Sequence, residues 1–254
     1  MTTADGRMKK NLTNLKYTSR QIKKKRRKIY RTILTESKNI NQGNFNAIGP
    51  DDLARLFDLY DTHFFDGFFN KNYSGKIFFR LSDRMTRAGG KIEHRDATGT
   101  HTIVLSTALI FQTFSDVTRQ VTVNGVICRD RLEATMRILE HEIIHLLEQV
   151  HFGSTSCSMP RFKRLSRDIF GHTDVTHRLV TQVERAHAKY DLRVGSNVSF
   201  EYAGVTHHGV ITRITVRATV MVKDPDGDYR DLSGAMYSKY YIPLEHLRQS
   251  DNER

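Results

Sequence analysis

The chain has 254 residues, of which 38% are hydrophobic and 27% charged, a composition that argues against collagen-like, mucin-like and wholly disordered proteins. No run approaches the roughly 18 apolar residues of a membrane span, the first residues lack the apolar segment of a secretory signal, and 2 cysteines are too few for a disulfide framework. We therefore expect an intracellular protein of the cytoplasm, nucleoid or nucleus, with one large domain or two smaller ones.

The formal net charge of +12 is concentrated near the N-terminus. Of the 40 Lys and Arg residues, twelve lie between residues 7 and 31, which contain no Asp or Glu, and the other 28 balance the 28 acidic residues. Like charges repel, so residues 1–34 are expected to form an arm that is disordered, or helical only on a partner, and that binds DNA phosphates. The alternatives are a solvated tail and an arm that binds an anionic membrane. The densest basic residues, and the predicted nucleic-acid contacts, are Lys23, Lys24, Lys25, Arg26, Arg27 and Lys28.

The polar segment 35–48 is expected to be a linker. Pro50-Asp51-Asp52 predicts the start of a helix, because proline fits the first turn and acidic residues favour its N-terminal end. Strands are expected at 76–81 and 101–106, with a turn at 87–92 between them that leads into another strand, and a short helix is expected at 107–114. The first helix and the segment after it carry apolar residues that predict core: Leu53, Leu56, Phe57, Tyr60, Phe64, Phe65, Phe68 and Phe69.

Three further helices are expected before the short β segments that begin near residue 195. The first covers residues 129–149, and the second begins at Pro160 and ends at Gly171. The third is capped by Thr173 or Asp174 and carries Val175, Leu179, Val183 and Ala186. These elements predict an α+β domain over residues 49–192.

Short β segments dominate the rest of the chain. They cover 198–202, 209–214, 218–223 and 240–243, with turns at Gly204 and at Asp226-Gly227. Closely spaced strands of this kind predict a small all-β barrel of the SH3-like or Tudor-like type over residues 195–248.

The motif His141-Glu142-Ile143-Ile144-His145 lies within the helix expected at 129–149. Histidines at positions i and i+4 lie on one face of a helix and can bind one Zn²⁺ ion. Zinc lowers the pKa of bound water towards about 7, and Glu142 is placed to act as the general base. The alternative is a pair of ordinary helix histidines with a charged neighbour.

A third ligand is less well marked. His151 follows His145 with metzincin spacing, but Glu148 stands where that pattern has glycine. If the helix continues through Glu148, His151 lies ~15 Å along the axis from His141. Cys157 and His172, both in expected loops, are the two remaining candidates, and each could equally be structural.

Residues 51–177 resemble the SprT-like (Spartan-type) zinc metalloproteases. The resemblance rests on an ordered set of segments: Leu56-Phe57, Phe64-Phe65-Asp66-Gly67, Arg87-Ala88-Gly89-Gly90, Ile103-Val104-Leu105-Ser106, His141–His145, Phe162-Lys163-Arg164-Leu165 and Val175-Thr176-His177. One departure is clear. The family has its third ligand in an H-G-x-x-F segment, and Ser158, next to Cys157, occupies that histidine's position. His172 lies ten residues beyond Phe162, or ~15 Å along a straight helix.

The resemblance implies a zincin-like fold and a zinc-dependent peptidase that acts on DNA-associated or DNA-crosslinked proteins. The basic arm is consistent with a DNA partner, and no membrane partner is expected. The rival interpretation is a non-enzymatic DNA-binding or virion-associated protein with a relic zinc site, and the missing histidine of the H-G-x-x-F segment favours it.

Overall fold

The computed structural model describes residues 12–250, which form a mixed α+β structure with small sheets. The chain divides into two compact units. Unit 1 comprises the residues up to Phe114 together with Arg119–Leu179, and unit 2 comprises Ser115–Thr118 and the residues from Val180 onward. No helix in the described part of the chain is long and apolar enough to cross a membrane.

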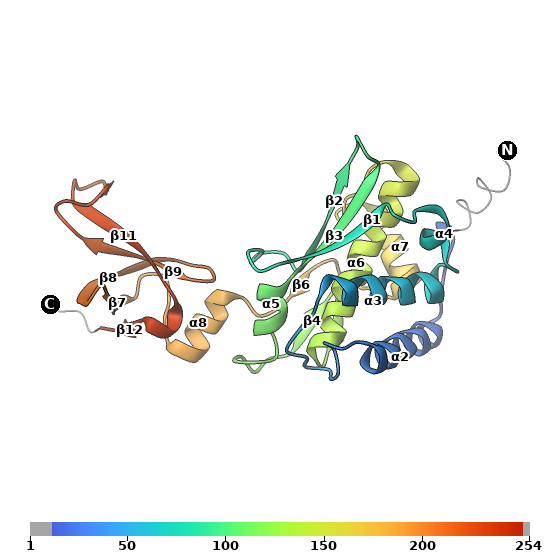
Figure 1. Cartoon of the computed structure of the whole chain (residues 1–254), viewed down its shortest axis with the longest axis horizontal. Coiled ribbons are helices and arrows are strands. Elements are labelled where there is room, and N and C mark those ends of the chain that lie inside the picture. The colour runs from blue at the N-terminus through green and yellow to red at the C-terminus, as the bar shows by residue number, and fades with distance from the viewer. Residues whose placement is uncertain (1–11, 251–254) are drawn as a thin grey trace. The chain divides into compact units, whose positions relative to one another are not determined.

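Unit 1 contains a three-stranded sheet in the order β1-β3-β2 (Figure 1). The strands predicted at 76–81 and 101–106 are confirmed as β1 (Ile77–Ser82) and β3 (Thr100–Ser106), which are parallel. Between them in sequence lies β2 (Gly90–Arg95), which pairs antiparallel with β3 and stands at the edge of the sheet.

The central element of unit 1 is α6 (Arg131–Phe152), the helix predicted at 129–149. It packs against β2, β3 and its neighbouring helices, so most of its side chains are buried. The Asp130 side chain caps its first turn by accepting a hydrogen bond from the Glu133 amide at 2.8 Å, and Gly153, with φ of 71°, ends it. The other helices of unit 1 are α2 (Ser19–Glu36), α3 (Pro50–Phe64), α4 (Phe68–Asn72), α5 (Thr107–Gln112) and α7 (Pro160–Phe170).

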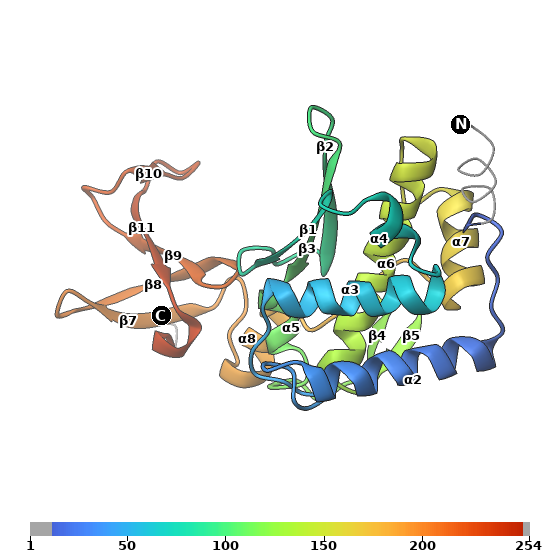
Figure 2. The ribbon, with the colours of Figure 1, turned by 45° about the vertical axis from the view of Figure 1, so that its right-hand side comes forward.

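The predicted disordered arm is wrong for residues 19–34, because they belong to helix α2, which lies beside α3 (Figure 2). Thr18 and Gln21 form a capping box at its start. Ile22, Ile29 and Ile33 share one face and are buried, so hydrophobic packing holds the helix despite the repulsion between its charges. Residues 12–18 are also ordered by packing, since Leu12 is buried in the core of unit 1 and the Tyr17 hydroxyl donates to the Phe64 carbonyl. Residues 1–11 of the predicted arm lie outside the described residues.

The predicted linker also proves to be part of unit 1. Residues 37–49 form neither helix nor strand, as the polar composition indicated. However, Ile40 and Phe45 are fully buried in the core of unit 1, so this segment is fixed by packing and is not a spacer between parts of the chain.

A second small sheet was not predicted. Strands β4 (Val121–Val123) and β5 (Val126–Cys128) form a hairpin, and β6 (His177–Arg178) pairs with β4. Asn124 and Gly125 make the turn with φ of 55° and 74°, as Asn-Gly hairpins do. The helix expected to start at Thr173 or Asp174 is wrong, because this segment runs into β6. Helix α8 (Gln182–Tyr190) begins only after Thr181, which forms a capping box with Glu184 in its first turn.

Unit 2 contains α8 and a six-stranded antiparallel sheet in the order β10-β11-β9-β8-β7-β12. Ala186 and Leu192 are buried in its core, so the boundary lies near residue 180 and not between 192 and 195 as predicted. The β content predicted for this region is confirmed, and closure into an SH3-like or Tudor-like barrel stays a prediction. The strands are β7 (Asn197–Tyr202), β8 (Val205–Ile214), β9 (Ala218–Lys223), β10 (Tyr229–Arg230), β11 (Met236–Ile242) and β12 (Arg248–Gln249).

Candidate metal centre

Helix α6 brings the two histidines of the motif together. Their Nε2 atoms are 3.1 Å apart. Two nitrogens bound to one tetrahedral zinc ion lie ~3.3 Å apart, given Zn–N bonds of about 2.0–2.1 Å. The ring of Phe162 packs against both imidazoles, at centroid distances of 4.8 Å from His141 and 4.4 Å from His145. The pair is therefore held close to the spacing that a single metal ion requires.

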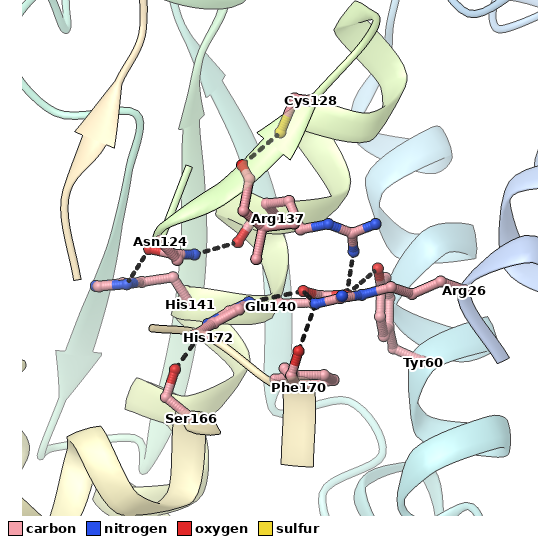
Figure 3. A network of polar contacts seen from close by, with 11 residues as sticks. Arg26, Tyr60, Asn124, Cys128, Arg137, Glu140, His141, Ser166, Phe170 and His172 are labelled. Carbon is pink, nitrogen blue, oxygen red and sulfur yellow. Dashed lines mark hydrogen bonds and ion pairs between the residues drawn. The ribbon is translucent and has the colours of Figure 1, made fainter. Parts of the chain in front are cut away.

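The other nitrogen of each ring is occupied by a hydrogen-bond partner. His141 Nδ1 lies 3.0 Å from Asn124 Oδ1, and His145 Nδ1 lies 2.6 Å from Thr155 Oγ1. The Asn124 amide group also donates to the Arg137 carbonyl at 2.8 Å, which orients its oxygen towards His141 (Figure 3). Partners on Nδ1 leave Nε2 of each ring for a metal, and this is how metal-binding histidines are commonly held.

Cys157 completes the group. Its Sγ atom and the ligand nitrogens of His141 and His145 all lie within 4.8 Å of one another, so these three side chains could hold a metal ion. In a tetrahedral site the sulfur would be ~3.6 Å from each nitrogen, given a Zn–S bond of about 2.3 Å. Since no distance in the group exceeds 4.8 Å, binding requires a shift of at most about one ångström.

His172, the other candidate third ligand, is not brought into this group. Its Nδ1 lies 2.7 Å from the Ser166 hydroxyl oxygen and its Nε2 lies 2.8 Å from Glu140 Oε2. Both ring nitrogens are thus engaged in a buried polar network centred on Glu140 (Figure 3). His151 is likewise excluded as expected, because α6 continues through Glu148 to Phe152.

The predicted nucleic-acid contacts divide into two groups. Arg26 is largely buried and donates two hydrogen bonds to Glu140, at 2.8 and 2.5 Å, so it belongs to the same network and not to a DNA-binding surface. Lys25 donates to the His63 carbonyl and lies over the Tyr17 ring. The remaining four side chains are exposed and available to a partner: Lys23, Lys24, Arg27 and Lys28.

Glu142 lies in the same cleft as the histidines. A Cβ atom added to Gly90 would come 2.6 Å from Glu142 Oε1, so only glycine there leaves room for the carboxylate. The Oε2 atom is buried and has no hydrogen-bond partner among the described residues. Burial raises the pKa of Glu142 to about 8, which makes its ionised form a stronger base than an exposed glutamate.

The cleft has a volume of ≈ 480 Å³ and is bordered by the edge strand β2. Its lining includes His177, which in the sequence was marked only by the family resemblance. The His177 ring lies 4.8 Å from that of His141, and its buried Nε2 has no hydrogen-bond partner among the described residues. Burial lowers the pKa of His177 to about 4, so its ring is neutral at pH 7. The remaining lining residues are Arg87, Ala88, Gly90, Lys91, Ile92, His141, Glu142, His145, Thr155, Cys157 and Val175.

Comparison of the chain with models of known protein families gives no match, and comparison with curated proteins gives none either. The SprT-like resemblance therefore rests on the sequence motifs alone.

Proposed function

We propose that this protein is a zinc-dependent metallopeptidase of the SprT-like type, with a zincin-like unit 1 and a small β-barrel in unit 2. The observation that carries the proposal is the 3.1 Å separation of the His141 and His145 Nε2 atoms beside a buried, unpartnered Glu142 oxygen. Two imidazoles and a thiolate form a ligand set that suits zinc, so His141, His145 and Cys157 would hold the ion.

A bound zinc ion supplies a Lewis acid that polarises a carbonyl group and lowers the pKa of water. The protein supplies the proton transfer. Glu142 would accept a proton from the attacking water on a carboxylate oxygen and deliver it to the nitrogen of the leaving amine. Burial favours the protonated form of Glu142 in the metal-free cleft, and the positive charge of a bound zinc ion would favour the ionised carboxylate that accepts the proton. Its Oε2 atom has no hydrogen-bond partner among the described residues that would compete for this role.

The substrate would be an extended peptide. Strand β2 stands at the edge of its sheet, and its residues Gly90, Lys91 and Ile92 line the cleft beside Glu142. An edge strand offers free backbone groups with which a peptide can pair. We propose that the peptide lies along β2 with its scissile bond facing the two histidines.

Proteins on or near DNA are the proposed substrate class. The exposed side chains of Lys23, Lys24, Arg27 and Lys28 form one basic surface of α2, and phosphate groups are suitable counterions for such a surface. The rival, a non-enzymatic DNA-binding or virion-associated protein with a relic zinc site, shares this surface but requires no working base in the cleft.

The test is metal analysis together with protein cleavage, with and without DNA. We expect one zinc ion per chain in the wild type, none in His141→Ala/His145→Ala, and weakened binding in Cys157→Ala. His172→Gln is the matched control, because it alters the other candidate ligand and should retain zinc. Cobalt substitution adds a direct probe of the thiolate, since only a sulfur ligand gives sulfur-to-cobalt charge transfer. Zinc content in the double variant equal to that of the wild type would refute the site, and zinc binding without any cleavage would favour the rival.

A further inference from the structure

Glu148, which occupies the position of glycine in the metzincin pattern, is fully buried in α6. A buried carboxylate is costly unless it is paired and hydrogen-bonded. Its Oε1 accepts a hydrogen bond from Arg161 Nε at 2.7 Å, and its Oε2 accepts one from the Thr155 hydroxyl at 2.7 Å. The Glu148 carboxylate is therefore paired with Arg161 and hydrogen-bonded by Thr155. Thr155 also contacts His145 of the candidate metal centre.

The direction in which the Thr155 hydroxyl donates its hydrogen determines which ring nitrogen of His145 carries the proton. A hydroxyl group has a single hydrogen to donate. Since Thr155 donates it to Glu148, its oxygen can only accept from His145 Nδ1, which lies 2.6 Å away. His145 must then carry its proton on Nδ1, which leaves the lone pair of Nε2 directed at the cleft and at His141 Nε2.

We propose that Glu148 and Thr155 are positioning residues that fix the tautomer and orientation of His145 for metal binding. The proposal rests on the proposed zinc site. The negative charge, acting through the hydroxyl group, would make His145 a better electron donor to a cation, as carboxylate partners do for metal-binding histidines. His141 differs, because its Nδ1 faces the neutral amide of Asn124.

The same assembly anchors the loop that carries Cys157. Arg161 donates to the Ser154 carbonyl at 3.0 Å and lies 3.9 Å over the ring of Phe152. Glu148 thereby joins the last turns of α6, the loop and the first turn of α7. One buried carboxylate thus holds one histidine ligand and the segment of the proposed cysteine ligand.

The test compares Thr155→Val, Thr155→Ser and Glu148→Gln in the full-length protein. Zinc affinity is measured by competition with a chelator, and the His145 tautomer is measured by ¹⁵N NMR on metal-free protein. We expect Thr155→Val to weaken zinc binding by about 10–100-fold and to lose the fixed Nδ1–H tautomer. Serine keeps the hydroxyl group and should restore both, and Glu148→Gln should weaken zinc binding.

Thr135→Val is the matched control, because Thr135 is also buried in α6 but its hydroxyl donates to the Arg131 carbonyl, away from the centre. It should retain the zinc affinity and the tautomer of the wild type. Unchanged affinity and tautomer in Thr155→Val would overturn the inference. If the wild type itself bound no zinc, the proposed function would fail. The tautomer of His145 in the metal-free variants would still show whether Glu148 and Thr155 fix its proton on Nδ1.

Discussion

Glu140 precedes His141 and receives hydrogen bonds from four side chains. The donors are Arg26 of α2, Tyr60 of α3, Arg137 of α6 and His172 in the segment after α7. Figure 3 shows these side chains around the carboxylate. Burial alone would raise the pKa of Glu140, but Arg137 and Arg26 outweigh it and hold the pKa well below its usual range. Glu140 therefore stays charged and ties α2 to the helix that bears the motif.

Glu140→Gln tests how much this network contributes to the stability of the fold. The substitution keeps the shape of the side chain but leaves two buried guanidinium groups without their counter-charge. We expect a loss of about 3–5 kcal/mol in the free energy of unfolding, measured with urea and circular dichroism. Glu36→Gln is the control, since Glu36 pairs with Arg55 at the surface and its loss should hardly change the unfolding midpoint. Equal midpoints for Glu140→Gln and the wild type would refute the role of the network.

Sequence spacing was sufficient to predict some residues of the candidate centre and insufficient for others. His141, Glu142 and His145 are neighbours on one helix, so local periodicity places them. Asn124 and Thr155 reach the histidines through contacts that only the tertiary fold creates, although the Asn124-Gly125 pair did carry an overlooked hairpin signal. Cys157 could be named as a candidate, but its choice over His172 required knowing which ring nitrogens were already engaged.

At the level of elements, proline at the first turn together with apolar spacing predicted α3 and α7, and apolar spacing alone predicted α6. Helix α2 was missed since its basic residues suggested repulsion and disorder. Its three buried isoleucines recur at helical spacing, but they are sparse among charged residues. The energy that stabilises α2 comes from packing against the rest of unit 1, and these contacts cannot be read from the local sequence.

The exposed basic residues of α2 are the proposed contacts to DNA. Replacing Lys23, Lys24, Arg27 and Lys28 by alanine should weaken DNA binding without unfolding the protein, because all four are exposed. The slope of log affinity against log salt should decrease in magnitude by roughly 0.9 for each phosphate that the variant no longer neutralises. Fluorescence anisotropy with labelled duplex at several salt concentrations measures both effects. Unchanged affinity and slope would show that DNA, if bound, is bound elsewhere.

On the scale of the whole molecule, the two units have separate hydrophobic cores. The core of unit 1 draws on residues from Leu12 to Leu179, and that of unit 2 on residues from Ala186 to Leu247. No buried hydrophobic residue of the described chain is shared between the two clusters. Each core should therefore support its own unit.

A chain that ends at Leu179 tests this independence. We expect it to stay folded, with the helical circular dichroism signal of unit 1 and a cooperative thermal transition, because its core is complete without unit 2. The comparison is with the full-length chain under the same conditions. Aggregation or a non-cooperative transition in the truncated chain would show that unit 1 depends on unit 2 for stability.

The central claim, that the cleft hydrolyses peptide bonds with Glu142 as the base, is tested most directly by Glu142→Gln. Glutamine preserves size and leaves His141, His145 and Cys157 untouched, so the variant should fold and bind zinc like the wild type. Loss of a positioned general base should slow protein cleavage by about 10²-fold or more. The decisive measurement is the cleavage rate and zinc content of the two proteins, prepared side by side. Normal zinc with cleavage reduced to that degree is the predicted result, and cleavage at the wild-type rate would contradict it.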